Sequence, residues 1–232
     1  MSLVFSFSFF LPLLWAVYFI KKDCHPEPKK YLIFAFFLGI LSALLSFFFE
    51  GIIKNLYLID SLAIQFLIFA FIEEFFKFLV IALLIFPLKV FDEPIDAVIY
   101  MTMSAFGFAF VENLAYALSV SENFGVLELN PLTVLFLRFL SANFLHILAS
   151  ILIGFGYAYF MKTRIFFSYL IGLFAASFLH FLHNYLIIKL QVGFFLVIPL
   201  LWGVFSFIIS EFYLIKDQNE LSISRLKPYE EI

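Results

Sequence analysis

Seven long apolar stretches, separated by short polar clusters, make up nearly the whole chain. They run approximately over Ser2–Ile20, Tyr31–Phe49, Ser61–Phe86, Ile95–Leu118, Pro131–Phe160, Ile165–Ile188 and Phe194–Leu214. A helix needs about 20 apolar residues to cross the hydrocarbon of a bilayer. The stretches are apolar on all sides and do not alternate, which favours helices over the strands of a barrel. The pattern predicts an all-α integral membrane protein with seven transmembrane helices.

Composition agrees with the pattern and leaves little room for a soluble part. Of the 232 residues, 65% are hydrophobic and only 13% are charged, and the mean hydropathy is +1.09. A soluble domain carries about a quarter charged residues. We therefore expect one transmembrane domain over residues 1–232, ending in a polar tail from about residue 215 to residue 232. The net charge of −3 and the lack of any basic run longer than two residues argue against a nucleic-acid partner.

Lysine and arginine residues are distributed unequally between alternate loops, which predicts the orientation. One side receives Lys21, Lys22, Lys29, Lys30, Lys89, Lys162, Arg164, Lys216, Arg225 and Lys227; the other receives Lys54 and Lys189. The richer side is expected to be cytoplasmic, which places the N-terminus outside and the C-terminal tail inside. Cys24 then lies in a reducing loop. The first stretch lacks a basic leader and a cleavage site, so we expect a retained helix.

The informative residues are polar side chains at membrane depth in four consecutive stretches, at about 61–86, 95–118, 131–160 and 165–188. They are Glu73, Glu74 and Lys77; Glu112 and Asn113; Arg138 and His146; and His180, His183 and Asn184. Each charge near the centre of a bilayer costs about 3 kcal/mol on insertion scales, so this many are tolerable only where they face one another or a wet pocket. Spacings of three and four residues place them on one face of each helix. We predict that they converge in the outer half of the membrane.

Two kinds of chemistry suit this set of residues. Glutamate, histidine and asparagine can supply a base for water, a proton for a leaving amine and hydrogen bonds for an oxyanion, which are the parts of a hydrolase. Alternatively, Glu74, Glu112, His146 and His180 are a plausible set of ligands for a divalent metal such as zinc. We lean slightly towards a metal-free or loosely metal-dependent site. The sequence has no HExxH motif, no GxSxG-like motif and no aspartate deep in a helix, which leaves a glutamate-based site.

Four ordered motifs resemble those of a known family. Glu73–Lys77 matches EExxK, Gly107–Asn113 matches GFxxxEN, Arg138 precedes His146 at the next element, and His180–Asn184 matches HxxxN. In this order, over roughly half of the chain, they resemble the PrsW-type intramembrane proteases, relatives of the CAAX prenyl endopeptidases. The latter carry a histidine where this chain has Glu112.

The resemblance implies a multi-pass protease of the bacterial cell membrane. Its substrate would be a single-pass anti-sigma factor, cleaved on the extracytoplasmic side. It also implies Glu73 or Glu74 as the base that activates water, with His146 assisting. His180 and Asn184 would stabilise the oxyanion, and Glu112 would be a second acidic or metal-binding group. Lys77 and Arg138 would balance charge, with Asn113 and His183 supporting the site.

Other interpretations of the same residues remain open. A transporter could use the carboxylates and histidines as an ion or proton relay, although Gly/Pro-interrupted helices in matching halves, which would favour it, are missing from the pattern. An inactive protein of the same fold could act by binding alone. Glu73, Glu74 and Lys77 could form an ion-pair lock between helices, and Arg138 could pair with a carboxylate or reach the outer headgroups. Glu50, just after the second stretch, is predicted to have no function.

Overall fold

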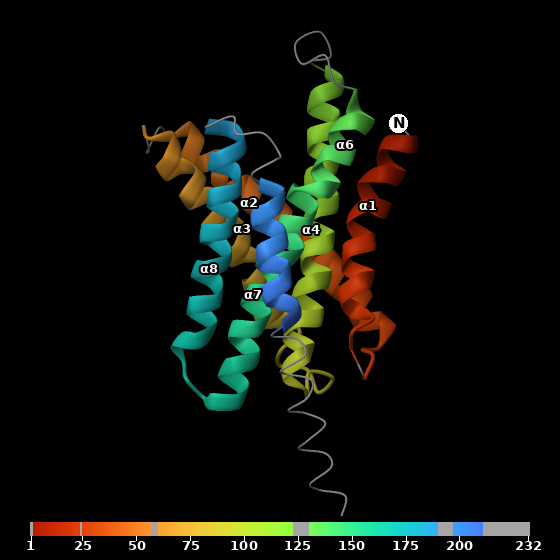
Figure 1. Cartoon of the computed structure of the whole chain (residues 1–232), viewed down its shortest axis with the longest axis vertical. Helices are drawn as coiled ribbons and strands as arrows, with labels where there is room; N and C mark the ends of the chain where they lie inside the picture. Colours follow the sequence, from red (N-terminus) through yellow and green to blue (C-terminus); the bar gives the residue numbers. More distant parts are fainter. Residues whose placement is uncertain (1, 24, 57–59, 123–129, 190–196, 211–232) are drawn as a thin grey trace, which may run out of the picture.

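The computed structural model describes residues 2–23, 25–56, 60–122, 130–189 and 197–210, and every regular element in these ranges is helical (Figure 1). The elements are α1 (Ser2–Ile20), α2 (Lys29–Asn55), α3 (Leu62–Leu84), α4 (Pro94–Glu122), α6 (Pro131–Leu140), α7 (Ala142–Thr163), α8 (Phe167–Asn184), the π-helical turn η1 (Tyr185–Lys189) and a last helix, Val197–Ser210. The prediction of an all-helical protein is confirmed for this part of the chain. Cys24 and the polar tail lie outside it.

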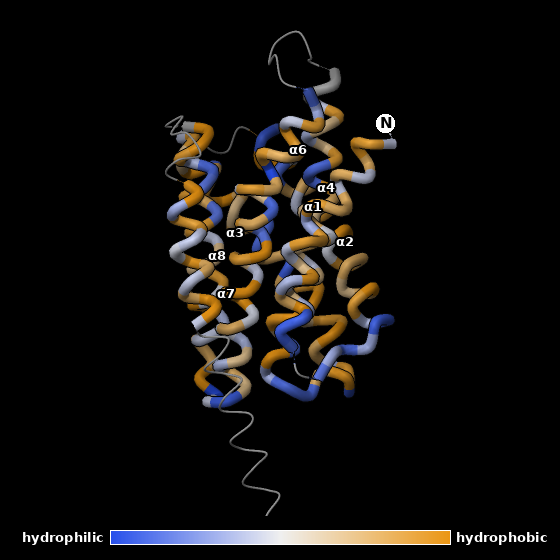
Figure 2. Tube along the Cα trace, turned by 45° about the vertical axis from the view of Figure 1, so that its right-hand side comes forward, coloured by the Kyte–Doolittle hydropathy of each residue, from blue (hydrophilic) through white to orange (hydrophobic). Residues whose placement is uncertain are grey.

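Five helical segments are long and apolar enough to cross a membrane by length and composition. They are Ser2–Ile20, Lys29–Asn55, Pro94–Ser119, Pro131–Thr163 and Phe167–Ile188. Helix α3 has a similar length, 23 residues, but carries three charged side chains. The last helix, Val197–Ser210, is apolar but shorter than these five segments. In Figure 2 the long helices are largely orange, whereas hydrophilic positions collect at the lower loops.

Helix α4 lies at the centre of the bundle and packs against α1, α2 and α7, while α8 packs against α3 and α7. Glycines make the closest of these approaches. A Cβ atom added to Gly39 of α2 would lie 2.0 Å from the Ser104 carbonyl oxygen, and one added to Gly107 of α4 would lie 2.0 Å from the Phe36 carbonyl oxygen. Small residues allow membrane helices to approach in this way. The close α2–α4 contact brings the end of α2 beside the polar part of α4.

Capping contacts set where the helices begin. Asn130 caps α6, since its Oδ1 accepts a hydrogen bond of 2.8 Å from the Thr133 backbone N–H, with Pro131 at the first position as the sequence indicates. Before α4, an Asp96 Oδ2 atom accepts the backbone N–H groups of Asp92 and Glu93 at 2.9 and 2.8 Å. These contacts fix the start of the central helix.

The stretch predicted as one helix over Pro131–Phe160 is broken at Ser141. The Ser141 backbone has φ −126° and ψ −80°, and its N–H bonds to the Arg138 carbonyl at 3.3 Å. Its hydroxyl instead donates to the Leu137 carbonyl at 3.0 Å, the acceptor that its own N–H would use in a regular helix. Such serine bonds to the backbone bend helices without any Gly or Pro, which is why the hydrophobic pattern misses the break.

Helix α2 also differs from its predicted length, because it continues past Phe49 to Asn55. The charge of Glu50, directly after the apolar stretch, had indicated that the helix ends there. In the structure Ser42, Ser46 and Glu50, spaced four residues apart, are all buried on one face. Glu50 is therefore an interior residue of α2, next to the polar residues of α3.

Candidate functional site

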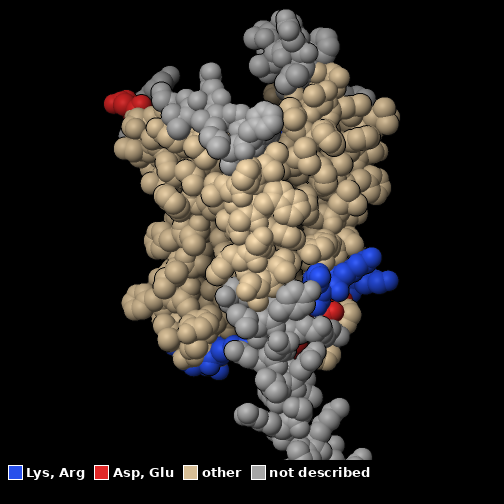
Figure 3. Space-filling view, in the orientation of Figure 1, with Lys and Arg blue, Asp and Glu red and all other residues tan. Residues whose placement is uncertain are grey.

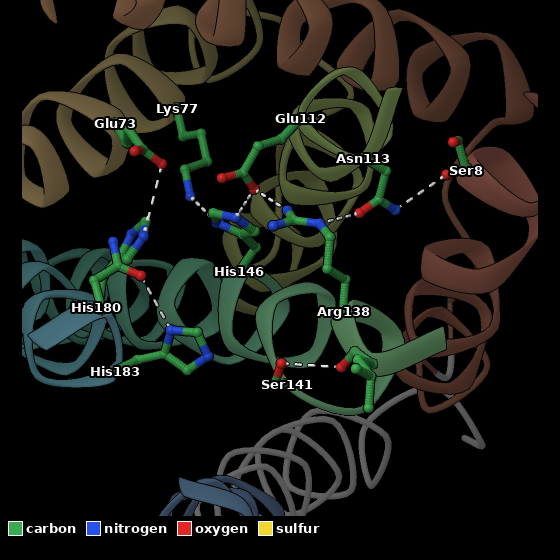
Figure 4. A network of polar contacts seen from close by, with 12 residues as sticks. Ser8, Glu73, Lys77, Glu112, Asn113, Arg138, Ser141, His146, His180 and His183 are labelled. Atoms are coloured by element: carbon green, nitrogen blue, oxygen red, sulfur yellow. Dashed lines mark hydrogen bonds and ion pairs between the residues drawn. The ribbon is translucent and has the colours of Figure 1, made fainter. Parts of the chain in front are cut away.

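The polar residues of the four predicted stretches come together between α3, α4, α6, α7 and α8, as Figure 4 shows. Glu73, Glu74 and Lys77 come from α3, Glu112 and Asn113 from α4, Arg138 from α6, His146 from α7, and His180, His183 and Asn184 from α8. The side chains of Lys77 and Glu74 are completely buried. The spacing of three and four residues thus places them on inward faces, as the sequence predicts.

Lys77 joins one carboxylate of α3 to the histidine of α7. Its Nζ lies 2.6 Å from Glu74 Oε1 and 3.1 Å from His146 Nδ1, and it lies 4.5 Å from the centre of the Phe108 ring. An ammonium group only donates hydrogen bonds. His146 Nδ1 must therefore accept from Lys77, which leaves the ring proton of neutral His146 on Nε2.

The second nitrogen of His146 faces Glu112. His146 Nε2 lies 2.6 Å from Glu112 Oε2, and Arg138 Nη2 donates to the same oxygen at 2.6 Å. Arg138 Nε also donates to Asn113 Oδ1 at 2.8 Å, and the Asn113 amide donates to the Ser8 carbonyl of α1 at 3.4 Å. Arg138 thus pairs with a carboxylate, one of its two predicted roles, and the contacts extend from the site to the first helix.

His180 is oriented by the two neighbouring glutamates of α3. Its Nδ1 lies 2.8 Å from Glu74 Oε1, and its Nε2 lies 3.7 Å from Glu73 Oε2. The short contact assigns the ring proton to Nδ1, where it donates to Glu74. The lone pair of Nε2 then points towards Glu73. In this tautomer His180 cannot donate a hydrogen bond from Nε2 to an oxyanion, so its role changes from donor to ligand or base.

Glu73 differs from Glu74 in what surrounds it. Both side chains have a buried Oε2 without a hydrogen-bond partner among the described residues, but the Glu73 side chain also lines a cavity. Glu74 lines none of the described cavities and is held through Oε1 by Lys77 and His180. The sequence does not separate the two neighbouring carboxylates. Their surroundings do, because of the two only Glu73 lines one of the described cavities.

Glu73, His146 and His180 fit a metal ion. One carboxylate oxygen and one nitrogen of each ring lie within 4.8 Å of one another, and all three residues are buried. Three protein ligands with imidazole and carboxylate donors are typical of catalytic zinc sites. The set differs from the predicted one, since Glu73 takes the place of Glu74, and Glu112 contacts His146 instead of joining the cluster. His180 Nε2 and Glu73 Oε2 are available as ligand atoms. His146 would have to give up its contact with Lys77 or its contact with Glu112 in order to bind the metal.

Two cavities reach the cluster. One, of about 320 Å³, is lined by His146, His180 and His183, and the other, of about 480 Å³, is lined by Glu73. Glu112 and Asn184 line both. The Asn184 Oδ1 atom also accepts a hydrogen bond of 3.1 Å from His183 Nδ1. The described residues thus offer open space on both sides of Glu112, where a substrate chain could lie.

The sequence interpretation missed one residue at this site. Glu50 of α2 is only 8% exposed, lines the same cavity as Glu73, and has an Oε1 atom without a hydrogen-bond partner in the described part of the chain. Its position after an apolar stretch resembles a helix end. The spacing Ser42, Ser46, Glu50 is the signal that could have placed it on the inner face.

Comparisons with known proteins agree with the motifs. The family model described as PrsW family intramembrane metalloprotease matches residues 27–210. Curated relatives called Protease PrsW include one from Geobacillus kaustophilus, 28% identical over 65% of this chain and 62% of the relative, and one from Oceanobacillus iheyensis, 34% identical over 44% of this chain and 48% of the relative. A third, from Bacillus subtilis, is 27% identical over 44% of this chain and 48% of the relative.

The chain spans about half to three-fifths of the length of these curated relatives. No solved structure matches it. The family match covers all the described helices except α1, and it includes the motifs that carry Glu73, Glu112, His146 and His180. This match, together with the buried cluster and the apolar helices, shows that the chain is a membrane protein that belongs to the PrsW family of intramembrane metalloproteases.

Proposed function

We propose that this protein is an intramembrane endopeptidase that hydrolyses a peptide bond of a single-pass membrane protein near the extracytoplasmic side. The observation that carries the proposal is the buried cluster of Glu73, His146 and His180, which opens into cavities on either side of Glu112. Membership of the PrsW family supports the same activity. An anti-sigma-factor-like substrate is the finer part of the proposal and rests on the resemblance of the motifs.

The residues have distinct roles in this proposal. Glu73 is the base that takes a proton from water, because its side chain lines the cavity and its Oε2 has no hydrogen-bond partner among the described residues. Glu74 orients His180, and Lys77 keeps the proton of His146 on Nε2 as long as His146 holds no metal, so that this proton is shared with Glu112. Asn184 lines both cavities and can donate its amide to the developing oxyanion.

A divalent metal such as zinc would be held by Glu73, His146 and His180, and when bound it would lower the pKa of its water and polarise the scissile carbonyl. A carboxylate has two oxygens, so Glu73 can offer one as a ligand and use the other to accept a proton. The description of the family as metalloproteases favours the metal-dependent alternative over the metal-free one.

The proposed orientation places seven spans in the membrane, with the N-terminus outside and the C-terminal tail in the cytoplasm. In Figure 3 the lysine and arginine side chains collect at the lower end of the molecule. This end carries the C-terminal ends of α1, α3 and α7 and the N-terminal end of α2. The cavity residues belong to the opposite ends of α2, α4 and α8, which supports a site in the outer half.

The test is co-expression with candidate single-pass substrates, with cleavage followed by immunoblot. We expect Glu73→Gln and His180→Ala to lower cleavage at least about 100-fold, since general-base catalysis contributes this much. Glu93→Gln, just before the start of α4 and far from the site, is the matched control and should cleave like wild type. Cleavage unchanged in Glu73→Gln and His180→Ala would contradict the proposal, and substrate-independent proton flux in liposomes would favour the transporter.

Metal content provides a second measurement that does not depend on activity. Purified wild type should contain about one divalent ion per chain by elemental analysis, since the three donors form one site. His180→Ala should lose this ion, whereas Glu93→Gln should retain it. An equal metal content in wild type and His180→Ala would contradict the proposed ligands. So would an active wild type that contains no metal.

A further inference from the structure

The two cavities at the site differ in their lining. Apart from the site residues Glu112, Arg138, His146, His180, His183 and Asn184, the cavity beside the histidines is lined mainly by apolar side chains of α6, α7 and η1, namely Val134, Leu137, Leu145, Ile187 and Ile188. We call it the apolar cavity. The cavity beside Glu73, the polar cavity, is lined by Glu50, Lys54, Gln65 and Ser119 as well as by phenylalanines. Glu112, Tyr116, Asn184 and Ile188 line both and form the wall between them.

The polar cavity lies at the end of the molecule opposite to the lysine-rich one. Its residues come from the last turns of α2 and α4, the first half of α3 and the end of α8. These ends lie at the top of Figure 1. The apolar cavity also includes Val134 of the first turn of α6 and Ile188, so both cavities reach this end of the molecule. A chain that crosses the wall at Glu112 would place the residues on one side of the scissile bond in the apolar cavity and those on the other side in the polar cavity.

Acidic side chains outnumber basic ones in the lining of the polar cavity, where Glu50, Glu73 and Glu112 lie with Lys54. Glu50 is buried, its Oε1 has no partner, and within the described residues no Lys or Arg lies within 4.0 Å of the Glu50 or Glu73 carboxyl group. The exposed Lys54 lies 4.8 Å from the centre of the Phe69 ring. A basic ligand that pairs with Glu50 would offset the cost of burying its charged form.

The remaining lining suits the stem of such a ligand. Phe47, Phe66 and Phe69 provide aromatic walls beside Glu50. The side chains of Lys and Arg place apolar stems along such surfaces and direct the charged group to a carboxylate, and aromatic faces attract the cation. A volume of about 480 Å³ leaves room for one long side chain and the adjoining backbone.

We infer that the polar cavity is a substrate subsite for a basic side chain, with Glu50 as its counter-charge, and that the apolar cavity takes apolar side chains from the other side of the scissile bond. This inference rests on the proposed function. It defines the substrate class as an apolar membrane segment on one side of the cleaved bond, with lysine or arginine close to the bond on its other side. Glu50 is then a residue that determines specificity.

The experiment uses the whole protein in liposomes with a series of single-pass test substrates. Each substrate has an apolar span of 20 residues and a Gly/Ser flank that carries one Lys, Gln or Glu at successive positions. We expect wild type to cleave the best Lys substrate about tenfold faster in kcat/KM than its Glu counterpart. Glu50→Gln should reduce this ratio to less than about threefold, through slower cleavage of the Lys substrate.

Lys54→Gln is the matched variant, because it removes the opposite charge one turn further along α2. It should preserve or widen the preference for Lys. A preference that is unchanged in Glu50→Gln, or a preference of wild type for Glu, would overturn the subsite. An equal loss of kcat/KM on all substrates in Glu50→Gln would also overturn it, because Glu50 would then only support Glu73. If wild type cleaves none of the test substrates, like Glu73→Gln, the proposed function itself fails.

Discussion

Lys77 is the most deeply buried cation of the site, and Glu74 is its only carboxylate partner within 4.0 Å among the described residues. An ion pair without access to water is strongly coupled, since removal of one partner leaves the other charge uncompensated. The same carboxylate oxygen also holds His180. Glu74 therefore has a structural and an orienting function, which the sequence motif alone does not distinguish.

These two functions of Glu74 can be separated by a pair of variants. Glu74→Gln should lower the stability by about 3–5 kcal/mol, because Lys77 is left buried and unpaired. Glu74→Gln with Lys77→Met should recover most of this stability but not the cleavage, since His180 still lacks its charged acceptor. Thermal unfolding in detergent and substrate cleavage provide the two measurements. Full cleavage by the double variant would show that the orientation of His180 does not depend on Glu74.

The sequence predicts which residues meet at the site, but not which contacts they make. Charged side chains inside apolar stretches are costly in contact with lipid, so Glu73, Lys77 and His180 were expected to face one another. Whether Glu73 or Glu74 pairs with Lys77 depends on rotamers and on neighbours about 100 residues away, such as His180. Glu50 was missed because a single charge after an apolar run resembles a helix end.

At the scale of helices, the α2–α4 contact determines where Glu50 and Glu112 lie relative to one another. Gly39 and Gly107 allow the two backbones to touch, with no space for a methyl group at either position. Gly107 belongs to the GFxxxEN motif, which also contains Glu112. The glycine of this motif thus has a packing function, and its glutamate lies at the site.

Gly107→Ala should separate α2 from α4 and destabilise the protein by about 1–3 kcal/mol, the usual cost of overpacking. Gly51→Ala is the matched control, because a Cβ atom there has nothing within 4 Å. The midpoint of thermal unfolding and the cleavage rate should both fall for Gly107→Ala and remain near wild type for Gly51→Ala. An equal change in both variants would mean that the close contact with α2 does not matter at Gly107.

Helix positions followed from hydrophobic pattern, whereas helix ends and breaks did not. Apolar runs of 20 residues fix where a helix must be. The break at Ser141 depends on one hydroxyl that competes for the Leu137 carbonyl, and such local competition leaves no trace in hydropathy. The extension of α2 to Asn55 depends on burial of Glu50 by other helices.

For the whole molecule, the unequal distribution of positive charge predicts accessibility from the two sides. In a Cys24→Ser background, Lys54→Cys should react with a membrane-impermeant maleimide in intact cells, whereas Lys89→Cys should react only after lysis. Both side chains are exposed at opposite ends of the bundle. Labelling of Lys89→Cys in intact cells would reverse the proposed orientation and would place the polar cavity towards the cytoplasm.

The charged face of α3 has a consequence for biogenesis. With three charges at about 3 kcal/mol each, this segment is a poor candidate for independent release from the translocon into lipid. The histidine that completes its contacts, His180, leaves the ribosome 106 residues after Glu74. During that interval α3 must be sheltered by helices already made or by the insertion machinery, so stable integration of this segment is coupled to completion of the later helices.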